Sequence, residues 1–320
     1  MELFYSFRPL LKTVLWGGDR ISAFKGVSTD LSHVGESWEL SAVPGRESVV
    51  EGGPDDGKTL TQLVEDYGAA LVGEGCCRRF GTQFPLLVKL IDARQDLSVQ
   101  VHPGDEMAQR LHGCPGKNEM WYVIDADDRA LIGAGLSRTV TPDEFKHMVD
   151  VGTVADVVAW HRTHAGDVFY LPAGRIHTIG AGNFVAEIQQ TSDITYRVFD
   201  YNRRDADGNL RQLHTDLACE AIDYRVSDSY AEQVPAPSPG VAGLVKSPYF
   251  TVDRVVVAGS QELPEVPGFL IVMCIAGEAR LSGGGSSCRL RQGQTVLVAA
   301  AAPALTAEGD ATLITATVPE

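Results

Sequence analysis

A glutamine, a histidine and a glutamate in one stretch of the chain could together hold a divalent cation. Gln100 and His102 stand two positions apart in the alternating run LSVQVH, residues 97–102. Alternation with a period of two is typical of a β-strand, so both side chains would share one face, about 7 Å apart. Glu119 follows in the β-rich run EMWYVI, residues 119–124. Amide, imidazole and carboxylate groups that meet on one sheet are candidate ligands for a divalent metal.

A second motif supplies another histidine, directly after a turn rich in glycine and proline. Its spacing is Gly166-x5-Pro172-x-Gly174-x2-His177, and the apolar run before the proline predicts a strand. Pro172 and Gly174 would shape the turn, so that His177 begins the returning strand. From here to Phe199 short β-type runs alternate with turn residues, which indicates an all-β region.

Composition and charge limit the class of protein. The 320 residues include 44% apolar and 22% charged residues, which is ordinary for a globular chain of one large domain or two domains. The net charge of −15 argues against nucleic acid as the main partner. It does not exclude an anionic small substrate, because a local group of Lys and Arg can outweigh a distant negative surface.

Cysteine spacing and hydropathy indicate a cytoplasmic protein. The six cysteines form no C-x2-C pair, and we expect free thiols in a reducing compartment. The N-terminal residues MELFYSFRP do not have the pattern of a signal peptide. The longest apolar stretches are too short to cross a bilayer, so no membrane partner is expected.

Helices and a linker interrupt the predicted strands. Apolar residues recur at helical spacing within residues 54–75 and again from Val154 to His161, and Thr141-Pro142 is a typical helix start. Residues 227–240 carry prolines at 235, 237 and 239 and read as a linker. We therefore predict a metal-binding catalytic domain with helical insertions over 1–226 and a smaller β-domain over 241–320.

Both metal motifs resemble the two conserved motifs of the cupins, which are small jelly-roll barrels. Gln100 stands where the first cupin motif has a histidine, and Glu119 comes later than usual, after an inserted helix and turn. The run 293–298 echoes the run 166–171, but the second copy has no ligands: Ala299, Ala301 and Ala304 replace Pro172, Gly174 and His177. We expect a mainly β fold with two cupin-type barrels (a bicupin) and a few inserted helices. Only the first barrel would hold a metal.

Four separated segments resemble class I mannose-6-phosphate isomerase (phosphomannose isomerase) in its short bacterial form. They are LSVQVHP, GKNEMW, LPAGRIHTIGAG and TYRVFDYNR, and the likeness extends from about Trp16 to Tyr224. The resemblance implies a zinc-dependent aldose–ketose isomerase that interconverts mannose 6-phosphate and fructose 6-phosphate. It implies one Zn²⁺ per chain and a set of site residues. The implied ligands are Gln100, His102, Glu119 and His177, the essential arginine is Arg197, and the lysines near the sugar phosphate are Lys89 and Lys117.

The expected chemistry moves a carbonyl between C1 and C2 through an enediol or enediolate. A zinc ion held by neutral groups and one carboxylate keeps net positive charge and can act as a Lewis acid. Arg197 would stabilise the developing oxyanion. Lys117, Glu36, Glu187 or a zinc-bound hydroxide could move the proton. Lys89, Glu36 and Glu187 are the predicted substrate contacts.

Three alternatives remain at this stage. The chain could be a cupin that binds a sugar or a metal without turnover, or an isomerase of an unphosphorylated aldose. It could also be a dioxygenase with iron in the same ligands, because imidazole and carboxylate groups bind iron as well. The sequence leaves the oligomeric state open.

Overall fold

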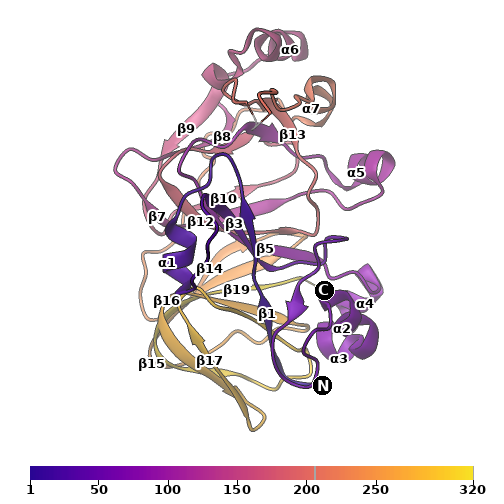
Figure 1. Ribbon diagram of the computed structural model, residues 1–320, viewed down its shortest axis with the longest axis vertical. Helices are drawn as coiled ribbons and strands as arrows, with labels where there is room; N and C mark the ends of the chain where they lie inside the picture. The colour runs from indigo at the N-terminus through magenta and orange to yellow at the C-terminus, as the bar shows by residue number, and fades with distance from the viewer. Residues whose placement is uncertain (205–206, 320) are drawn as a thin grey trace.

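Three β-sheets and seven short α-helices make up the computed structural model, which describes residues 1–204 and 207–319 (Figure 1). The prediction of a mainly β fold is confirmed. No helix in these two ranges has both the length and the apolar character needed to cross a membrane.

The middle layer of the molecule is a six-stranded antiparallel sheet in the order β10-β7-β12-β5-β3-β2. Every residue of its strand β5 is buried, because other layers cover both faces of the sheet. The strands are β2 (Leu10–Thr13), β3 (Val34–Leu40), β5 (Leu86–Asp92), β7 (Glu119–Ala126), β10 (Val168–Leu171) and β12 (Asn183–Gln190).

A five-stranded sheet in the order β13-β6-β11-β8-β9 packs against one face of this middle layer. Trp121 and Val185 of the six-stranded sheet share a core with Ile132 and Ile179 of the five-stranded sheet. The two sheets form the barrel-like sandwich that holds the predicted metal ligands. The strands are β6 (Val99–Val101), β8 (Leu131–Leu136), β9 (Val158–Arg162), β11 (His177–Ile179) and β13 (Tyr196–Phe199).

Helices cover the outer face of the five-stranded sheet, at the top of Figure 1. Helix α6 begins as predicted, because the Thr141 hydroxyl accepts a hydrogen bond from the Glu144 amide and Pro142 takes the first position. Its Phe145 packs on the buried strand residue Val101. The elements here are α5 (Asp105–His112), α6 (Pro142–Val151), the 3₁₀ turn η1 (Val154–Val157) and α7 (Thr215–Ala221).

Six strands from the C-terminal part of the chain and two from its N-terminal part form an eight-stranded sheet with a core around Val255, Leu281 and Leu313. Its other face packs on the six-stranded sheet, together with helices near the N-terminus. The strands are β1 (Phe4–Arg8), β4 (Val49–Val50), β14 (Gly240–Lys246), β15 (Thr251–Glu262), β16 (Leu270–Gly283), β17 (Ser286–Arg291), β18 (Thr295–Val298) and β19 (Thr306–Thr317). The remaining helices are α1 (Arg20–Lys25), α2 (Leu60–Tyr67), α3 (Ala69–Val72) and α4 (Glu74–Phe80).

The N-terminal strand belongs to this C-terminal sheet. Strand β1 pairs with β18, with Phe4 opposite Val298, and on its other side with β4. The division into residues 1–226, 227–240 and 241–320 stays a prediction. The pairing of β1 shows that the first of these ranges contributes strands to the sheet of the last.

A tight contact between β8 and the start of the predicted linker gives a stability prediction. Gly135 has a φ of 77°, and a Cβ there would lie 2.1 Å from the ring of Tyr230, whose hydroxyl donates to the Leu136 carbonyl. We expect Gly135→Ala to lower the free energy of unfolding by about 2–5 kcal/mol, from left-handed backbone strain plus overpacking. Urea denaturation measures this loss.

The matched control is Gly45→Ala. Gly45 has a φ of 76°, but a Cβ there would meet no atom within 4 Å. Only the backbone strain should remain, at about 1–2 kcal/mol. Equal losses in the two variants would show that the Tyr230 contact carries no energy.

Candidate metal centre

Strand pairing places three of the predicted site residues in one row. Gln100 on β6 lies opposite His177 on β11 and, on its other side, opposite Arg197 on β13. Directly opposed side chains on neighbouring strands have Cβ atoms about 4.5–5.5 Å apart. His102 follows two positions after Gln100, and Glu119 begins β7 in the facing sheet. The sandwich therefore brings all four predicted metal ligands to one place.

The ligand atoms lie close together in the interior. Nε2 of His102 is 3.1 Å from Nε2 of His177. The Glu119 carboxylate lies 3.4 Å from the first of these atoms and 3.2 Å from the second. The side-chain amide of Gln100 is 3.3 Å from Nε2 of His177. His102, Glu119 and His177 each expose 1% or less of their surface.

Hydrogen bonds on the far side of each imidazole point both Nε2 atoms at the same spot. Nδ1 of His102 donates to the Ile194 carbonyl and Nδ1 of His177 to the Arg175 carbonyl, each at 2.8 Å. A carbonyl only accepts, so in a neutral ring Nε2 carries the lone pair. Burial lowers the pKa of both histidines, that of His102 to about 3, so both rings are neutral at pH 7. Nζ of Lys117 lies 3.1 Å from Nε2 of His102, but the two facing lone pairs cannot bond each other, and a cation between them would satisfy both.

Glu119 supplies the negative charge of the set. Burial alone would raise the pKa of its carboxyl, but the charge of Lys117 lowers it well below its usual range. Nζ of Lys117 lies 2.7 Å from Oε2, yet neither oxygen accepts a hydrogen bond of good geometry. Buried carboxylate oxygens of this kind are ready metal ligands. Two imidazole nitrogens, a carboxylate and an amide oxygen suit a catalytic zinc site.

A cavity of about 400 Å³ opens beside these ligands. Arg197, Gln100 and Lys117 reach its wall from the metal side. Lys89, Glu36 and Glu187 reach it from the six-stranded sheet. Every residue predicted to act on the substrate therefore lines this one space.

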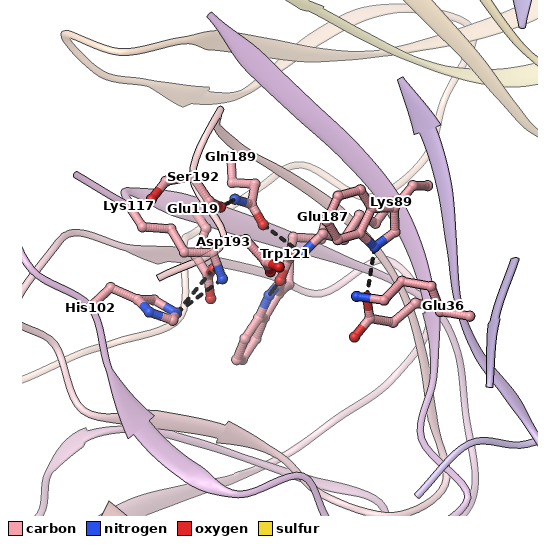
Figure 2. A network of polar contacts seen from close by, with 12 residues as sticks. Glu36, Lys89, His102, Lys117, Glu119, Trp121, Glu187, Gln189, Ser192 and Asp193 are labelled. Atoms are coloured by element: carbon pink, nitrogen blue, oxygen red, sulfur yellow. Dashed lines mark hydrogen bonds and ion pairs between the residues drawn. The ribbon is translucent and has the colours of Figure 1, made fainter. Parts of the chain in front are cut away.

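The lysine predicted to contact a substrate anion is already paired within the protein. Nζ of Lys89 donates to Glu187 and to Gln189, each at 2.8 Å, and Trp121 donates to the other Glu187 oxygen (Figure 2). Burial lowers the pKa of Lys89, but Glu187 and Glu36 raise it by a larger amount. The net pKa lies above its usual value, so the amine is charged. Its charge is balanced by these carboxylates, and its contact with a substrate anion stays a prediction.

Glu36 is an ionised carboxylate on the same wall. Burial raises its pKa, but Lys89, Lys12 and the indole donor of Trp38 lower it to a net value below the usual range. Nε1 of Trp38 donates to Oε2 of Glu36 at 2.6 Å. A carboxylate with a lowered pKa is a weak base, so Glu36 suits a hydrogen bond to a sugar hydroxyl better than proton abstraction.

Arg197 faces the cavity without a carboxylate of its own. It donates to the Ser98 hydroxyl at 3.3 Å and to the Gln212 carbonyl at 3.0 Å, and no acidic side chain in the described ranges forms an ion pair with it. Burial and the neighbouring Arg211 lower the pKa of Arg197. An anionic group in the cavity would compensate both effects.

Sequence reasoning missed four charged residues on the cavity wall: Lys12, Arg46, Asp193 and Arg211. Arg46 and Asp193 form an ion pair at 2.6 Å. Arg211 pairs with Asp200. Arg46 and Arg211 lie in loops without a recognisable motif, so no local signal identifies them. Asp193 lies two positions before the segment TYRVFDYNR and four before Arg197, and its place near the arginine was the one available signal.

Comparison with known proteins agrees with this geometry. Residues 5–128 match the family model "Phosphomannose isomerase type I, catalytic domain", and residues 241–318 match "Mannose-6-phosphate isomerase, cupin domain". The second match confirms the cupin class of the fold.

Curated relatives and a solved structure extend the likeness over the chain. Mannose-6-phosphate isomerase ManA of Bacillus subtilis is 36% identical over 300 residues, which cover 91% of each chain. Mannose-6-phosphate isomerase of Streptococcus mutans is 35% identical over 89% of this chain and 88% of its own. The crystal structure of the mannose 6-phosphate isomerase from Bacillus subtilis superposes with a TM-score of 0.90 at 32% identity, covering 99% of this chain and 100% of that one. The chain is therefore an isomerase that belongs to the type I mannose-6-phosphate isomerase family.

Proposed function

We propose that this enzyme interconverts mannose 6-phosphate and fructose 6-phosphate through an enediol or enediolate, with one zinc ion per chain. The observation that carries the proposal is the convergence of two neutral Nε2 atoms and the Glu119 carboxylate beside the cavity. His102, His177, Glu119 and Gln100 would hold the ion. A bound zinc ion supplies a fixed positive charge that polarises the reacting carbonyl.

Side chains on the cavity wall would do the remaining work. Arg197 stabilises the negative oxygen that develops during proton transfer, because its guanidinium faces the cavity without a carboxylate partner. Lys117 lines the cavity next to Glu119 and donates a hydrogen bond to a substrate oxygen there. Both candidate carboxylates on this wall already accept hydrogen bonds, Glu36 from Trp38 and Glu187 from Lys89 and Trp121, so each would be a weak base for the proton on carbon.

Positive charge on and near the cavity wall favours a phosphorylated sugar over a free aldose. Arg203 and Arg211 both form ion pairs with Asp200. Arg211 also lies close enough to Arg197 to lower the pKa of that guanidinium. Three guanidinium groups around one carboxylate leave local positive charge, although the whole chain carries −15. A sugar phosphate would balance it, whereas a neutral aldose would not.

A coupled assay of fructose 6-phosphate formation tests the proposal. We expect turnover of mannose 6-phosphate by the zinc-loaded protein, full loss after chelation, and recovery when zinc is restored. Free mannose serves as the matched substrate, with fructose measured as its product, and should react far more slowly. Turnover that survives complete metal removal would contradict the proposed role of the metal. A preference for free mannose would contradict the proposal that the substrate is a sugar phosphate. Activity that needs iron and oxygen would favour the dioxygenase alternative.

A further inference from the structure

A chain of polar side chains lies behind the metal ligands, outside the cavity lining. The Asn118 side chain donates to Oε1 of Gln190 at 2.7 Å, and its oxygen accepts from the Ala173 amide at 2.9 Å. The backbone amide of Asn118 also donates to that Gln190 oxygen, at 2.9 Å. Nε2 of Gln190 donates to Asp105 at 3.0 Å. Asn118 and Gln190 are buried, with 3% and 7% of their surface exposed.

This chain of hydrogen bonds touches every segment that carries a metal ligand. Asn118 directly precedes Glu119, Ala173 lies in the turn that leads to His177, and Asp105 opens the helix after His102. The ligands themselves are not fixed to one another in the same way. The Glu119 carboxylate contacts Lys117 at 2.7 Å, but among the described residues neither of its oxygens accepts a hydrogen bond of good geometry, and the backbone that Asn118 holds therefore helps to place it.

The chemistry of Asn118 requires an amide. Its nitrogen must donate to an oxygen, and its oxygen must accept from a backbone amide. An aspartate has the same shape and keeps the acceptor. It would, however, place a carboxylate oxygen against Oε1 of Gln190, and Gln190 cannot turn its amide round without losing its bond to Asp105.

We propose that Asn118 and Gln190 are positioning residues that hold Glu119, His102 and His177 at ligand distance and so set the affinity of the metal site. The inference rests on the proposed metal-dependent function. Groups behind a metal site change affinity because they fix ligand geometry in advance, and losing one typically costs about 10–100-fold in affinity. Neither residue lines the cavity.

Zinc affinity, measured by competition with a chromogenic chelator, tests this role in Asn118→Asp and Asn118→Ala. We expect both variants to bind zinc about 10–100-fold more weakly. Their kcat should return close to the parent value when zinc is in excess. The absorption spectrum of the cobalt-substituted protein gives a second readout of ligand geometry and should shift. Gln190→Glu removes the hydrogen-bond donor to Asp105, at the other end of this chain of hydrogen bonds. It should also lower the affinity for zinc.

Asn183→Asp is the matched control. Asn183 is fully buried on the same strand as Gln190 and makes three side-chain hydrogen bonds, to Leu131, Gly180 and Thr163. It lies at the opposite end of β12, about 20 Å away along the strand. We expect it to lower stability in urea without changing zinc affinity.

Three results would overturn the inference. Zinc could bind the Asn118 variants as tightly as it binds the parent. Alternatively, Asn183→Asp could lower the zinc affinity as much as the Asn118 variants do. The Asn118 variants could also lose kcat at saturating zinc with unchanged affinity. Failure of the proposed function looks different, because then the parent protein itself takes up no zinc, and the inference falls with it.

Discussion

Replacing Glu119 with glutamine is expected to remove both zinc and activity. The change keeps the size of the side chain but deletes the negative charge of the ligand set, and it leaves the buried Lys117 ammonium without the carboxylate that lies 2.7 Å away. An uncompensated buried charge and a neutral ligand set both oppose the binding of a second cation. A Lewis acid supplies several kcal/mol of transition-state stabilisation, so kcat/KM should fall by about 10³ or more.

Elemental analysis of the purified variant, together with the coupled assay, checks this expectation. Glu220→Gln is the control, because Glu220 forms an exposed ion pair with Arg110 at the surface. It should keep full zinc content and full activity. A Glu119→Gln protein with one zinc per chain and normal turnover would show that this carboxylate is not a ligand.

Arg197→Ala is expected to keep zinc and lose rate. Arg197 lies opposite Gln100 in the strand pairing, on the side away from His177, so it adjoins the ligands without belonging to them. Removing one preorganised donor to a developing oxyanion typically costs about 10²–10³ in kcat. Arg197→Lys keeps the charge but not the planar fork, and we expect only partial recovery.

Steady-state kinetics separate two roles for this arginine. A fall in kcat indicates contact with charge that develops in the transition state, whereas a rise in KM alone indicates uniform binding of the sugar phosphate. Arg225→Ala is the control, since the Arg225 side chain is 89% exposed and, within residues 1–204 and 207–319, pairs only with its near neighbour Asp223. Unchanged kcat and KM in Arg197→Ala would make the residue purely structural.

The candidate ligands could be predicted because their signals are local. Gln100 and His102 share one strand face at a spacing of two. His177 follows a turn that Pro172 and Gly174 predict. Helix α6 was predictable for the same reason, since Thr141 and Pro142 act within one turn. Signals of this kind need no knowledge of the distant chain.

Features that depend on long-range pairing could not be predicted in this way. The spacing of Val154, Val157, Val158 and His161 predicts a helix, and this prediction was wrong. One 3₁₀ turn is followed by strand β9, because pairing with β8 decides the structure there. The ion pair of Lys89 with Glu187 likewise follows from the register between β5 and β12, which no local pattern encodes. The hydrogen bond from Asn118 to Gln190 spans 72 positions.

The helix predicted within residues 54–75 was partly right. The Thr59 side chain caps α2 with a reciprocal bond from Gln62, as the sequence suggests for a helix start. The chain then breaks at Gly68 and Gly73 into separate short helices. A Cβ at Gly73 would lie 2.7 Å from Gly268, so close approach of the C-terminal part fixes this break.

The pairing of β1 with β18 has a consequence for how the polypeptide is made. Strand β1 leaves the ribosome long before β18 has been synthesised, so the backbone donors and acceptors that face β18 stay unpaired during nearly all of translation. Closing so long a loop is entropically slow, which favours late folding of this sheet. A nascent chain stalled before Thr295 should therefore be bound by chaperones or attacked by proteases at its N-terminal segment, and a released full-length chain should be protected there.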